Sequence, residues 1–404
     1  MSEQRVLIVG AGIAGLAASL ACGRAGLPVQ LVERAPEFQE VGAGIQIGPN
    51  VTRILRDWGL GDALAQVASL PDMLQVRSAV TGRALGSLPL GLDMRQRYGA
   101  PYATLHRADL HQLLLQAVQA QGRAEMQLAT QVLRFEQSTD GVDLVLANGG
   151  VQSGSVLLGA DGLWSAVRQQ LLDDAAPALT GHLAYRALLR QAELPQHLRS
   201  HQVTVWLGPR LHAVQYPVRG GDWLNLVVIV QGEPDWMQAA NSTPGEMANW
   251  NQEADRDQLQ RALRGSCGHL SELVAAAPAW RLWILCDREP MQEAQEHARG
   301  RVALIGDAAH PMRPYLAQGA GMAIEDAAAV AQVLSQAHPT TEAALQDFAQ
   351  RRWARNRQVQ ERSRRNGKIF HATGLVRWGR DAAMAVLGTR VLDLPWLYGA
   401  TQPA

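Results

Sequence analysis

Cysteine is scarce in this chain of 404 residues, and long apolar runs are missing from it. The three cysteines, Cys22, Cys267 and Cys286, are odd in number and far apart, so they predict neither a disulfide framework nor a metal cluster. This usage favours a reducing compartment, the cytoplasm. No uninterrupted apolar run reaches the roughly 18 residues of a membrane span, and we expect no transmembrane helix.

Net charge is also lacking, since the formal charge is zero and the pI is near 7.2. The sequence therefore has no basic field that would attract nucleic acid. Residues 6–22 are apolar, but three glycines interrupt them and the preceding MSEQR carries little positive charge, so we reject a signal peptide. With 47% hydrophobic and 18% charged residues the chain is globular. Its length allows two or three domains, or one large composite fold.

The N-terminus predicts a βαβ unit. Residues 5–9, RVLIV, are typical of a buried parallel strand. A helical pattern follows from about residue 13 to residue 25, and Gly26 ends it. Residues 28–33, PVQLVE, predict the second strand.

Further along, short alternating segments replace this pattern. A helix is predicted at about 108–120, and residues 126–158 predict an antiparallel meander. Residues 180–232 predict a half-covered antiparallel sheet. Residues 244–276 predict helix, and a strand at 301–306 precedes helices that continue to the end.

Seven arginines fall between Arg351 and Arg365, and we expect them on the solvated face of a long helix. No internal repeat or low-complexity linker is present. Because the strands that resemble a nucleotide fold are split by a β-rich section, the sequence predicts a mixed α/β (α+β) fold. Its parts are a Rossmann-like domain, an inserted antiparallel-sheet domain and C-terminal helices.

A glycine motif opens the first helix. VLIVGAGIAGLAA places Gly10, Gly12 and Gly15 as GxGxxG, which permits a tight turn, close approach of a pyrophosphate and close packing of helix on strand. The helix N-terminus then holds the diphosphate. Glu33 ends the second strand and is placed to bind ribose hydroxyls. These features together predict a site for a dinucleotide, either NAD or FAD. The alternative interpretation is a tight glycine turn that binds no ligand.

Two further motifs separate these cofactors. One is LLGADGLWSAVR, with Asp161, Gly162 and Arg168, and the other is GDAAHP, with Asp307. With the N-terminal motif they resemble the FAD-dependent aromatic-ring hydroxylases of the p-hydroxybenzoate hydroxylase type, over most of the chain. LHRADLHQLL fits a fourth family position. GAGIQIGPN (residues 42–50) and WLYG (residues 396–399) resemble the branch of salicylate hydroxylase, 3-hydroxybenzoate 6-hydroxylase and 6-hydroxynicotinate 3-monooxygenase.

The resemblance implies roles around bound FAD. Asp307 would bind the ribityl chain rather than only cap a helix, and the Pro314 carbonyl would face the ring. AQGAGMAIEDA begins a helix whose bare N-terminus would stabilise the negative charge of reduced flavin. Asp161 would touch FAD and the nicotinamide channel, with a β-turn as the alternative. The implied FAD residues are Gly10, Gly12, Gly15, Glu33, Arg34, Gly44, Arg107, Val132, Asp161, Asp307, Pro314, Gly319, Ala320, Gly321 and Met322.

The family reaction uses NADH or NADPH to reduce FAD, and dioxygen then gives a flavin C(4a)-hydroperoxide that hydroxylates a phenolic ring. This chemistry needs a base near the substrate hydroxyl and a dry pocket. His212 and Tyr216 are four apart on a predicted strand, so they share a face. They resemble the His and Tyr pair of the branch, and the alternative is a pair half-buried in the sheet. His310 belongs to a motif shared across substrates, so we expect it to shape the loop.

Substrate identity is less well defined. Arg186 and Arg313 are candidates for a substrate carboxylate. The residues PMRPY, which include Tyr315, match none of the three branch activities cleanly. We expect a hydroxylated aromatic acid, 3-hydroxybenzoate or salicylate-like, with a 6-hydroxynicotinate-type or quinone-precursor hydroxylase as alternatives. A flavin-fold binding protein without turnover is a further alternative.

The domain division follows from the split strands. Residues 1–75, 100–178 and 286–335 are assigned to an FAD-binding domain, residues 76–99 and 179–285 to a β-rich substrate domain, and residues 336–404 to a helical region. The expected partners are a small aromatic substrate and dioxygen, with no nucleic acid and no integral membrane association. Residues 375–399 could pack on the protein, form a homodimer contact or lie on a membrane surface as an amphipathic helix.

Overall fold

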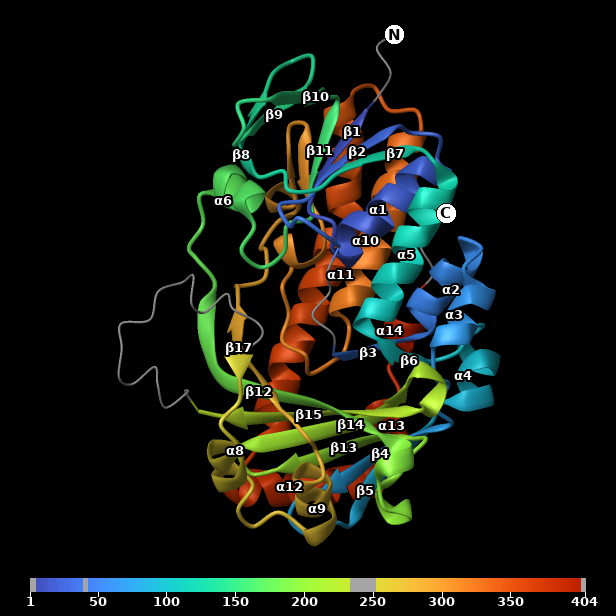
Figure 1. The fold of residues 1–404 in the computed structure, drawn as a ribbon, viewed down its shortest axis with the longest axis vertical. Coiled ribbons are helices and arrows are strands. Elements are labelled where there is room, and N and C mark those ends of the chain that lie inside the picture. Colours follow the sequence, from blue (N-terminus) through green and yellow to red (C-terminus); the bar gives the residue numbers. More distant parts are fainter. Residues whose placement is uncertain (1–4, 39–42, 233–251, 401–404) are drawn as a thin grey trace.

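A six-stranded sheet in the upper part of Figure 1 carries the N-terminal βαβ unit. The computed structural model describes residues 5–38, 43–232 and 252–400. β1 is buried at every residue and pairs in parallel with β2 and β11, as its continuous apolar run predicts. In sheet order the strands are β18 (Ala298–Arg299), β19 (Val302–Leu304), β11 (Val156–Gly159), β1 (Val6–Val9), β2 (Val29–Val32) and β7 (Ala124–Gln127).

The predicted meander over residues 126–158 was wrong at both ends. β7 at its start and β11 at its end join the parallel sheet. The last part of this range breaks at Ser155, whose amide donates to the Arg5 carbonyl at 2.9 Å. Only the middle forms an antiparallel sheet, of β8 (Val132–Gln137), β9 (Val142–Leu146) and β10 (Val151–Gly154).

An eight-stranded sheet forms the lower part of the molecule (Figure 1). Leu211 and Ala213 of its strand β14 pack in the apolar cluster that contains Leu259 and Leu270 of the helices α8 and α9, so the alternate residues of β14 face the opposite way. The strands in order are β16 (Gln252–Glu253), β17 (Arg281–Asp287), β12 (Ala178–Arg190), β15 (Trp223–Gln231), β14 (Leu211–Val218), β13 (Val203–Gly208), β4 (Met73–Ser78) and β5 (Ala84–Pro89).

The helical prediction for residues 244–276 holds only in part. Its residues 244–251 lie outside the described residues. Gln252–Glu253 pair with β17 as a strand, and helices α8 (Arg256–Ala262) and α9 (Gly268–Ala275) follow. A small two-stranded sheet of β3 (Gly44–Ile47) and β6 (Ala103–His106) lies between the two larger sheets in Figure 1.

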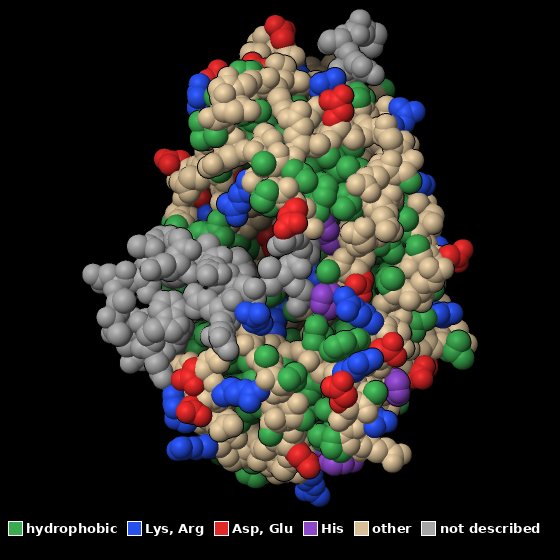
Figure 2. Space-filling view, viewed as in Figure 1, with side chains coloured by type: hydrophobic (Ala, Val, Ile, Leu, Met, Phe, Trp, Pro, Cys, Tyr) green, Lys and Arg blue, Asp and Glu red, His purple; other side chains and the backbone are tan. Residues whose placement is uncertain are grey.

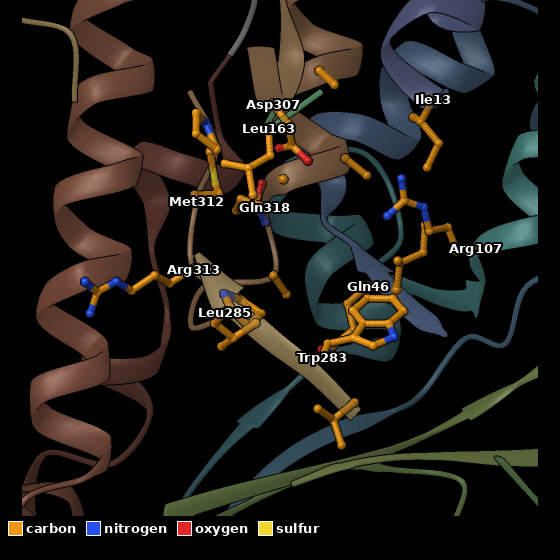
Figure 3. Close-up of a pocket in the computed structure, with 18 of the residues that line it drawn as sticks. Ile13, Gln46, Arg107, Leu163, Trp283, Leu285, Asp307, Met312, Arg313 and Gln318 are labelled. Carbon is orange, nitrogen blue, oxygen red and sulfur yellow. The ribbon is translucent and has the colours of Figure 1, made fainter. Parts of the chain in front are cut away.

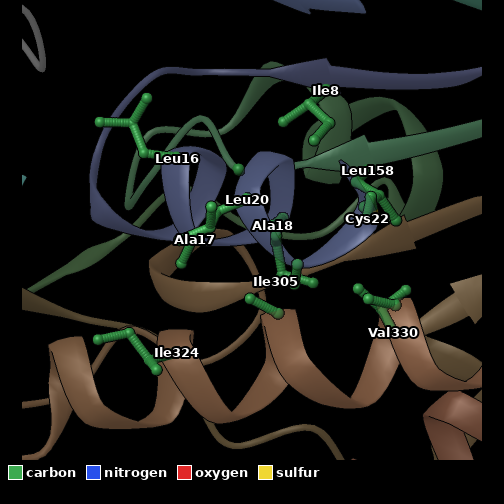
Figure 4. Close-up of a cluster of buried hydrophobic side chains, with 14 of the residues drawn as sticks. Ile8, Leu16, Ala17, Ala18, Leu20, Cys22, Leu158, Ile305, Ile324 and Val330 are labelled. Carbon is green, nitrogen blue, oxygen red and sulfur yellow. The ribbon is translucent and has the colours of Figure 1, made fainter. Parts of the chain in front are cut away.

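Helix α1 (Ile13–Arg24) packs against helix α10 (Gly319–Ser335) in the main core (Figure 4). The small residues Ala17 and Ala18 of α1 are fully buried, which lets the two helix backbones approach closely. Because α10 begins beside the start of α1, the packing brings two bare helix N-termini to one region. The other helices are α2 (Pro49–Asp57), α3 (Gly61–Val67), α4 (Gly91–Tyr98), α5 (Arg107–Gln121), α6 (Ala166–Leu172), α11 (Thr341–Phe370), α12 (Gly374–Leu387), α13 (Thr389–Leu392) and α14 (Pro395–Tyr398).

Helix α11 runs lengthwise from the upper part to the lower sheet (Figure 1). The prediction that its arginines form a solvated face was wrong for several of them. Arg352 is only 5% exposed, and it donates to Asp326 and Glu325 of α10 at 2.8 Å each. Arg365 is exposed, as expected. Two cations of this helix, Arg352 and Arg355, therefore neutralise the buried acids of α10 instead of facing solvent.

The mixed α/β fold predicted from the sequence is confirmed. The domain boundaries stay a prediction, although β4 and β5 do join the same sheet as β12 to β15. Acidic and basic side chains are interspersed over the face shown in Figure 2, in keeping with the zero net charge. Among the helices of the described ranges, none has the length and apolar character to cross a bilayer.

Candidate active site

A cavity of about 290 Å³, called here the central cavity, opens between the starts of α1 and α10 and the upper face of the eight-stranded sheet. Figure 3 shows Asp307, Arg107, Gln46 and Trp283 around it. It brings together residues that are far apart in the sequence. The predicted site residues that line it are Gly12, Gly44, Arg107, Arg186, His212, Tyr216, Asp307, Arg313, Pro314, Gly319 and Ala320.

A second cavity, called here the outer cavity, continues from the first. The two share Gly12, Ala160 and Gly162 in their walls. Such a pair of connected cavities fits an elongated dinucleotide whose diphosphate lies at the glycine loop. The predicted residues that line the outer cavity are Gly10, Gly12, Glu33, Arg34, Val132 and Asp161.

The glycine loop has the geometry that its motif predicts. Gly10 has φ +101°, and a Cβ there would lie 2.5 Å from the Ala160 carbonyl oxygen. A Cβ on Gly15 would lie 1.8 Å from the Gly10 carbonyl oxygen. Gly12 begins α1 without a side-chain cap. The N–H groups at this end are thus open to an anion, and the residues present fit a diphosphate.

Glu33 reaches the glycine loop from the end of β2. Its two carboxylate oxygens accept from the Ala11 amide at 2.7 Å and the Ala35 amide at 2.8 Å. Each oxygen retains a second lone pair. Glu33 therefore fixes the loop and still lines the outer cavity, where the ribose role was predicted.

The Asp161 carboxylate is turned toward helix α6. It accepts from Ser165 Oγ at 2.5 Å and from the Ala166 amide at 2.8 Å. Burial raises the pKa of Asp161, and these hydrogen bonds oppose that effect. Nearby, Arg168 donates to the carbonyls of Ala308 and Ala309, so this motif also supports the loop that carries Asp307.

Asp307 lines the central cavity. It follows β19 and is exposed, because the central cavity opens at that point. A Cβ on Gly319 would lie 3.9 Å from Asp307 Oδ1, so the carboxylate stands beside the start of α10. Gly319 and Ala320 line the cavity. Met322 is fully buried among apolar side chains, and Met322 and Gly321 are both absent from the cavity wall.

His310 lies away from the cavity, as expected for a scaffold residue. It is 1% exposed, and its Nε2 lies 2.5 Å from Asp326 Oδ2. The same oxygen accepts from the Gly306 amide at 3.0 Å. Asp326 thus ties the loop that begins at Gly306 to helix α10.

Side chains of helix α11 donate hydrogen bonds to the backbone carbonyl groups of the next part of this loop. Gln360 Nε2 donates to the Pro311 carbonyl at 2.8 Å, and Ser363 Oγ donates to the Arg313 carbonyl at 2.5 Å. Asn366 Nδ2 donates to the Tyr315 carbonyl at 3.1 Å. The three donors are spaced by three residues on one helix face, and the acceptors are alternate residues of the loop. This arrangement of three side-chain donors, called here the donor ladder, fixes the cavity wall that contains Pro314.

His212 and Tyr216 lie on the cavity face of β14, as their spacing predicts. Burial lowers the pKa of His212 well below its usual value, and the neighbouring His371 and His182 lower it further. Burial raises the pKa of Tyr216, and the Arg186 cation opposes this only in part. In the protein without substrate, therefore, His212 is a neutral imidazole and Tyr216 a neutral phenol.

Arg186 projects into the same end of the cavity from β12. Its guanidinium lies 3.7 Å from the ring centroid of Trp283, a cation–π contact. Its Nε has no hydrogen-bond partner within the described ranges. Burial lowers the pKa of Arg186 to about 10, so it stays charged at neutral pH. A buried cation with an unmet donor suits an anionic ligand.

The other two predicted substrate residues are placed less favourably. Arg313 lines the cavity with part of its side chain, but its Nε donates to Asp287 at 2.8 Å, and Figure 3 shows it extending away from Gln46 and Trp283. Tyr315 is 3% exposed and is absent from the cavity lining. Its hydroxyl lies 2.7 Å from His182 Nδ1. Neither geometry favours a direct substrate contact.

Sequence reasoning missed three residues of this region. Trp283 lies below the Arg186 guanidinium, and Gln46 accepts from the Tyr102 hydroxyl at 2.8 Å in the cavity wall. His371, at the C-terminal end of α11, lies 2.8 Å from His212. Trp283 could have been found as an aromatic residue on a strand of alternating pattern. No local signal marks His371.

Comparisons with known proteins agree with this geometry. The family model described as "FAD binding domain" matches residues 3–363. A 3-hydroxybenzoate 6-hydroxylase of Polaromonas naphthalenivorans is 36% identical and covers 98% of this chain and 95% of its own. A 6-hydroxynicotinate 3-monooxygenase of Bordetella bronchiseptica is 34% identical over 83% of each chain. A solved salicylate hydroxylase substrate complex has a TM-score of 0.81 at 27% identity and covers 100% of this chain and 99% of its own.

The connected cavities, the glycine loop and the bare start of α10 suit FAD, and the matched family is defined by its binding. The relatives match over nearly the whole length of the chain rather than over the nucleotide motif alone. This chain therefore belongs to the FAD-dependent aromatic-ring hydroxylases, a family of flavoprotein monooxygenases.

Proposed function

We propose that this enzyme hydroxylates the ring of a phenolic carboxylic acid of the 3-hydroxybenzoate class, with NADH or NADPH as reductant and dioxygen as the oxygen source. The observation that carries this proposal is the combination of His212, Tyr216 and Arg186 in one cavity. They offer a neutral base, a neutral hydrogen-bond donor and a buried cation. A hydroxyl and a carboxylate on one aromatic ring complement these three groups.

In this proposal Arg186 binds the carboxylate and orients the ring. The Trp283 face beneath its guanidinium keeps the cation in place. Charge-assisted bonds to an Arg are roughly twice as strong as neutral ones, so this contact sets the register of the substrate in the cavity. The walls from Val227, Ile229 and Leu285 exclude water from the ring.

His212 accepts the proton of the substrate hydroxyl, and Tyr216 donates to the substrate oxygen. The ring gains electron density as its hydroxyl is deprotonated, which favours attack by an electrophile. FAD would be held by the glycine loop, Glu33 and Asp307, and it would supply hydride acceptance from the reduced nicotinamide and, with dioxygen, an electrophilic oxygen for the ring. The N–H groups at the start of α10 stabilise negative charge beside Gly319 and Ala320.

A panel of aromatic acids tests the proposal in the FAD-loaded enzyme. 3-Hydroxybenzoate, salicylate and 6-hydroxynicotinate are compared by NADH and NADPH oxidation and by the hydroxylated product, with benzoate as the control without a hydroxyl. We expect coupled oxidation and product with 3-hydroxybenzoate. Oxidation without product identifies an effector, and product from 6-hydroxynicotinate alone would replace the proposed substrate class.

A quinone-precursor hydroxylase at a membrane surface is the second candidate, because α12 leaves apolar side chains in solvent. Leu375 is 88% exposed, Val386 is 83% exposed and Trp378 is 66% exposed. Cosedimentation with anionic vesicles, compared with a Leu375→Ser, Val386→Ser variant, tests this candidate. Equal recovery of both proteins in the supernatant would remove it, and a concentration-dependent dimer would assign the face to a second copy. As a hydroxylase of 3-hydroxybenzoate-class acids, by contrast, the enzyme would act in the cytoplasm.

A further inference from the structure

The candidate base His212 is one member of a buried histidine cluster. Its Nδ1 lies 2.8 Å from Nε2 of His371. The His371 ring centroid lies 4.8 Å from that of His182, with the two planes at 79°. His182 Nδ1 lies 2.7 Å from the Tyr315 hydroxyl. His212 and His371 are 1% and 3% exposed, so neither ring exchanges protons directly with bulk water.

The contact fixes which nitrogen of His212 is available to a ligand. Since Nδ1 is engaged by His371 and the ring lines the central cavity, Nε2 is the nitrogen left for the substrate. In a bond between two imidazole nitrogens only one can carry the proton. If His371 were the donor, the proton of neutral His212 would sit on Nε2, and this nitrogen could not accept the proton of the substrate hydroxyl.

We propose that His371 is a positioning residue that holds the proton of His212 on Nδ1 and receives it when the substrate hydroxyl transfers its own proton to Nε2. This inference rests on the proposed function of His212. The substrate O–H bond breaks, and an N–H bond forms at Nε2 of His212. The Nδ1–H bond of His212 breaks, and an N–H bond forms at Nε2 of His371. The electron pair stays on the substrate oxygen, and the positive charge ends on His371.

The position of His371 suits it to carry that charge. It is the C-cap residue of α11 that follows Phe370, at the end where the backbone carbonyls give the helix its negative charge. Arg380 donates to two of these carbonyls, those of Ile369 and Phe370, at 3.1 and 2.7 Å. A cation at such an end is stabilised by the negative end of the helix dipole. His212, in the middle of a strand, has no such support. When the proton moves from His212 to His371, the imidazolium lies outside the central cavity and only the substrate oxyanion lies inside it.

Several groups around His371 oppose its protonation in the protein without substrate. Burial lowers the pKa of His371 to about 3, with His182 and Arg380 as further causes. Burial also lowers the pKa of His182 to about 4, with Arg313 as a further cause. The groups that face the cluster are therefore His212 from β14, His182 from β12, Arg380 from α12, and Arg313 and Tyr315 from the loop. Asp287 pairs with Arg313 and Asp381 pairs with Arg380, so these carboxylates are already engaged by cations. An anionic substrate adds negative charge in the cavity, and protonation of His371 is thereby coupled to substrate binding.

The cluster also accounts for the place of Tyr315 outside the cavity. Burial raises the pKa of Tyr315, so its hydroxyl stays protonated, and it lies 2.7 Å from His182 Nδ1. His182 then presents its ring edge-on to His371. In this arrangement Tyr315 orients the wall behind the proton acceptor.

The first experiment measures the ionisation of bound 3-hydroxybenzoate by near-ultraviolet difference spectra of the FAD-loaded enzyme over a range of pH. His371→Gln keeps an acceptor for His212 Nδ1 but cannot take a proton. We expect the phenolate fraction to fall roughly tenfold at neutral pH, with the ionisation midpoint moved up by about one pH unit. Benzoate affinity should not change. An unchanged ionisation midpoint in His371→Gln overturns the proposed transfer.

A matched control separates this effect from the general loss of a histidine. His269 stacks on Trp206 on the opposite face of the sheet, with ring centroids 5.5 Å apart. Burial lowers its pKa as well. His269→Gln should leave the phenolate fraction as it is in the parent, and a fall equal to that in His371→Gln would show that the effect is not specific to the pair.

The second experiment needs no substrate. Nitrogen-15 NMR of the FAD-loaded enzyme identifies the protonated ring nitrogen of His212, with the signal assigned by its loss in His212→Gln. We expect Nδ1–H in the parent and a mixture of tautomers in His371→Leu. A parent with Nε2–H would overturn the inference. If 3-hydroxybenzoate fails to bind the parent, the proposed substrate class fails, while the NMR result still decides the role of His371.

Discussion

Gln360 on α11 donates to the carbonyl oxygen of Pro311 at 2.8 Å, and this bond joins a helix far from the nucleotide motif to the wall of the central cavity. It is one rung of the donor ladder, whose other rungs hold the carbonyls of Arg313 and Tyr315. The loop has little secondary structure of its own between residues 310 and 318. Its shape beside the central cavity therefore depends on donors from α11.

Removal of one rung should loosen this wall. Gln360→Ala leaves the buried Pro311 carbonyl unsatisfied, which costs about 1–3 kcal/mol of the free energy of unfolding. We expect FAD affinity to fall roughly tenfold, measured by recovery of flavin fluorescence on dilution of the loaded enzyme. Gln358→Ala is the matched control, because Gln358 is exposed on the same helix. Equal FAD affinities of the two variants would contradict the role of the ladder.

Asp326 is expected to be a major contributor to stability. It accepts from Gly306, Arg352 and Asn356 and contacts His310, with no exposure to solvent. Asp326→Asn leaves buried Arg352 with only Glu325 as an anionic partner, and we expect a loss of about 3–5 kcal/mol in the free energy of unfolding. Urea denaturation measures it. Glu361→Gln removes the exposed pair with Arg357 and should change this free energy by less than about 1 kcal/mol.

The same carboxylate predicts a pH dependence of stability. Although burial raises the pKa of Asp326, His310 and Arg352 outweigh this effect and hold the pKa well below its usual range. A carboxyl whose pKa is lower in the folded state contributes its stability above the unfolded pKa of about 3.9 and loses it as the pH falls below that value. Denaturation midpoints from neutral pH to acid should therefore fall less steeply in Asp326→Asn than in the parent. Parallel curves would contradict this assignment.

The parts of the site that the sequence predicts well are those set by neighbouring residues. A Cβ on Gly15 would meet the carbonyl oxygen of Gly10, five residues earlier, so the motif alone indicates this contact, whereas the close contact of Gly10 is with the distant Ala160. The alternation of His212 and Tyr216 places both on one face of a single strand. Their exposure to a cavity depends on α10 and on the loop after β19, which no local pattern encodes.

The wrong or incomplete predictions all involve packing between distant segments. The arginines of α11 have the pattern of a solvated face, but Glu325 and Asp326 lie in an otherwise apolar helix and require buried cations. That pair of acids is the signal by which the burial of Arg352 could have been predicted. Tyr315 lies in a cavity-lining loop, yet its hydroxyl is directed by His182 from β12, more than a hundred residues earlier.

The glycine loop offers a test of steric fit that is separate from backbone strain. Gly10→Ala imposes φ +101° on a residue with a Cβ and places that Cβ 2.5 Å from the Ala160 carbonyl oxygen. The strained backbone costs about 1–3 kcal/mol, and the clash adds to this. We expect a lower thermal midpoint and loss of FAD from the purified protein. Gly149→Ala has φ +83° with no atom within 4 Å, so it measures the strain alone. If Gly149→Ala destabilises the protein as much as Gly10→Ala does, close contact with Ala160 is not the reason for glycine at that position.

Arg186 should discriminate between substrates by charge. Its guanidinium is buried over Trp283 and remains charged, and charged hydrogen bonds of this kind contribute about 1.5–3 kcal/mol. Arg186→Gln should weaken 3-hydroxybenzoate binding roughly 10- to 100-fold, whereas binding of 3-hydroxybenzamide, which has no negative charge, should change only severalfold. Dissociation constants from flavin absorbance changes on titration of the oxidised enzyme give both values. Because the two ligands share the ring and the hydroxyl, an equal loss for both would mean that Arg186 supports the shape of the cavity and that the carboxylate binds elsewhere.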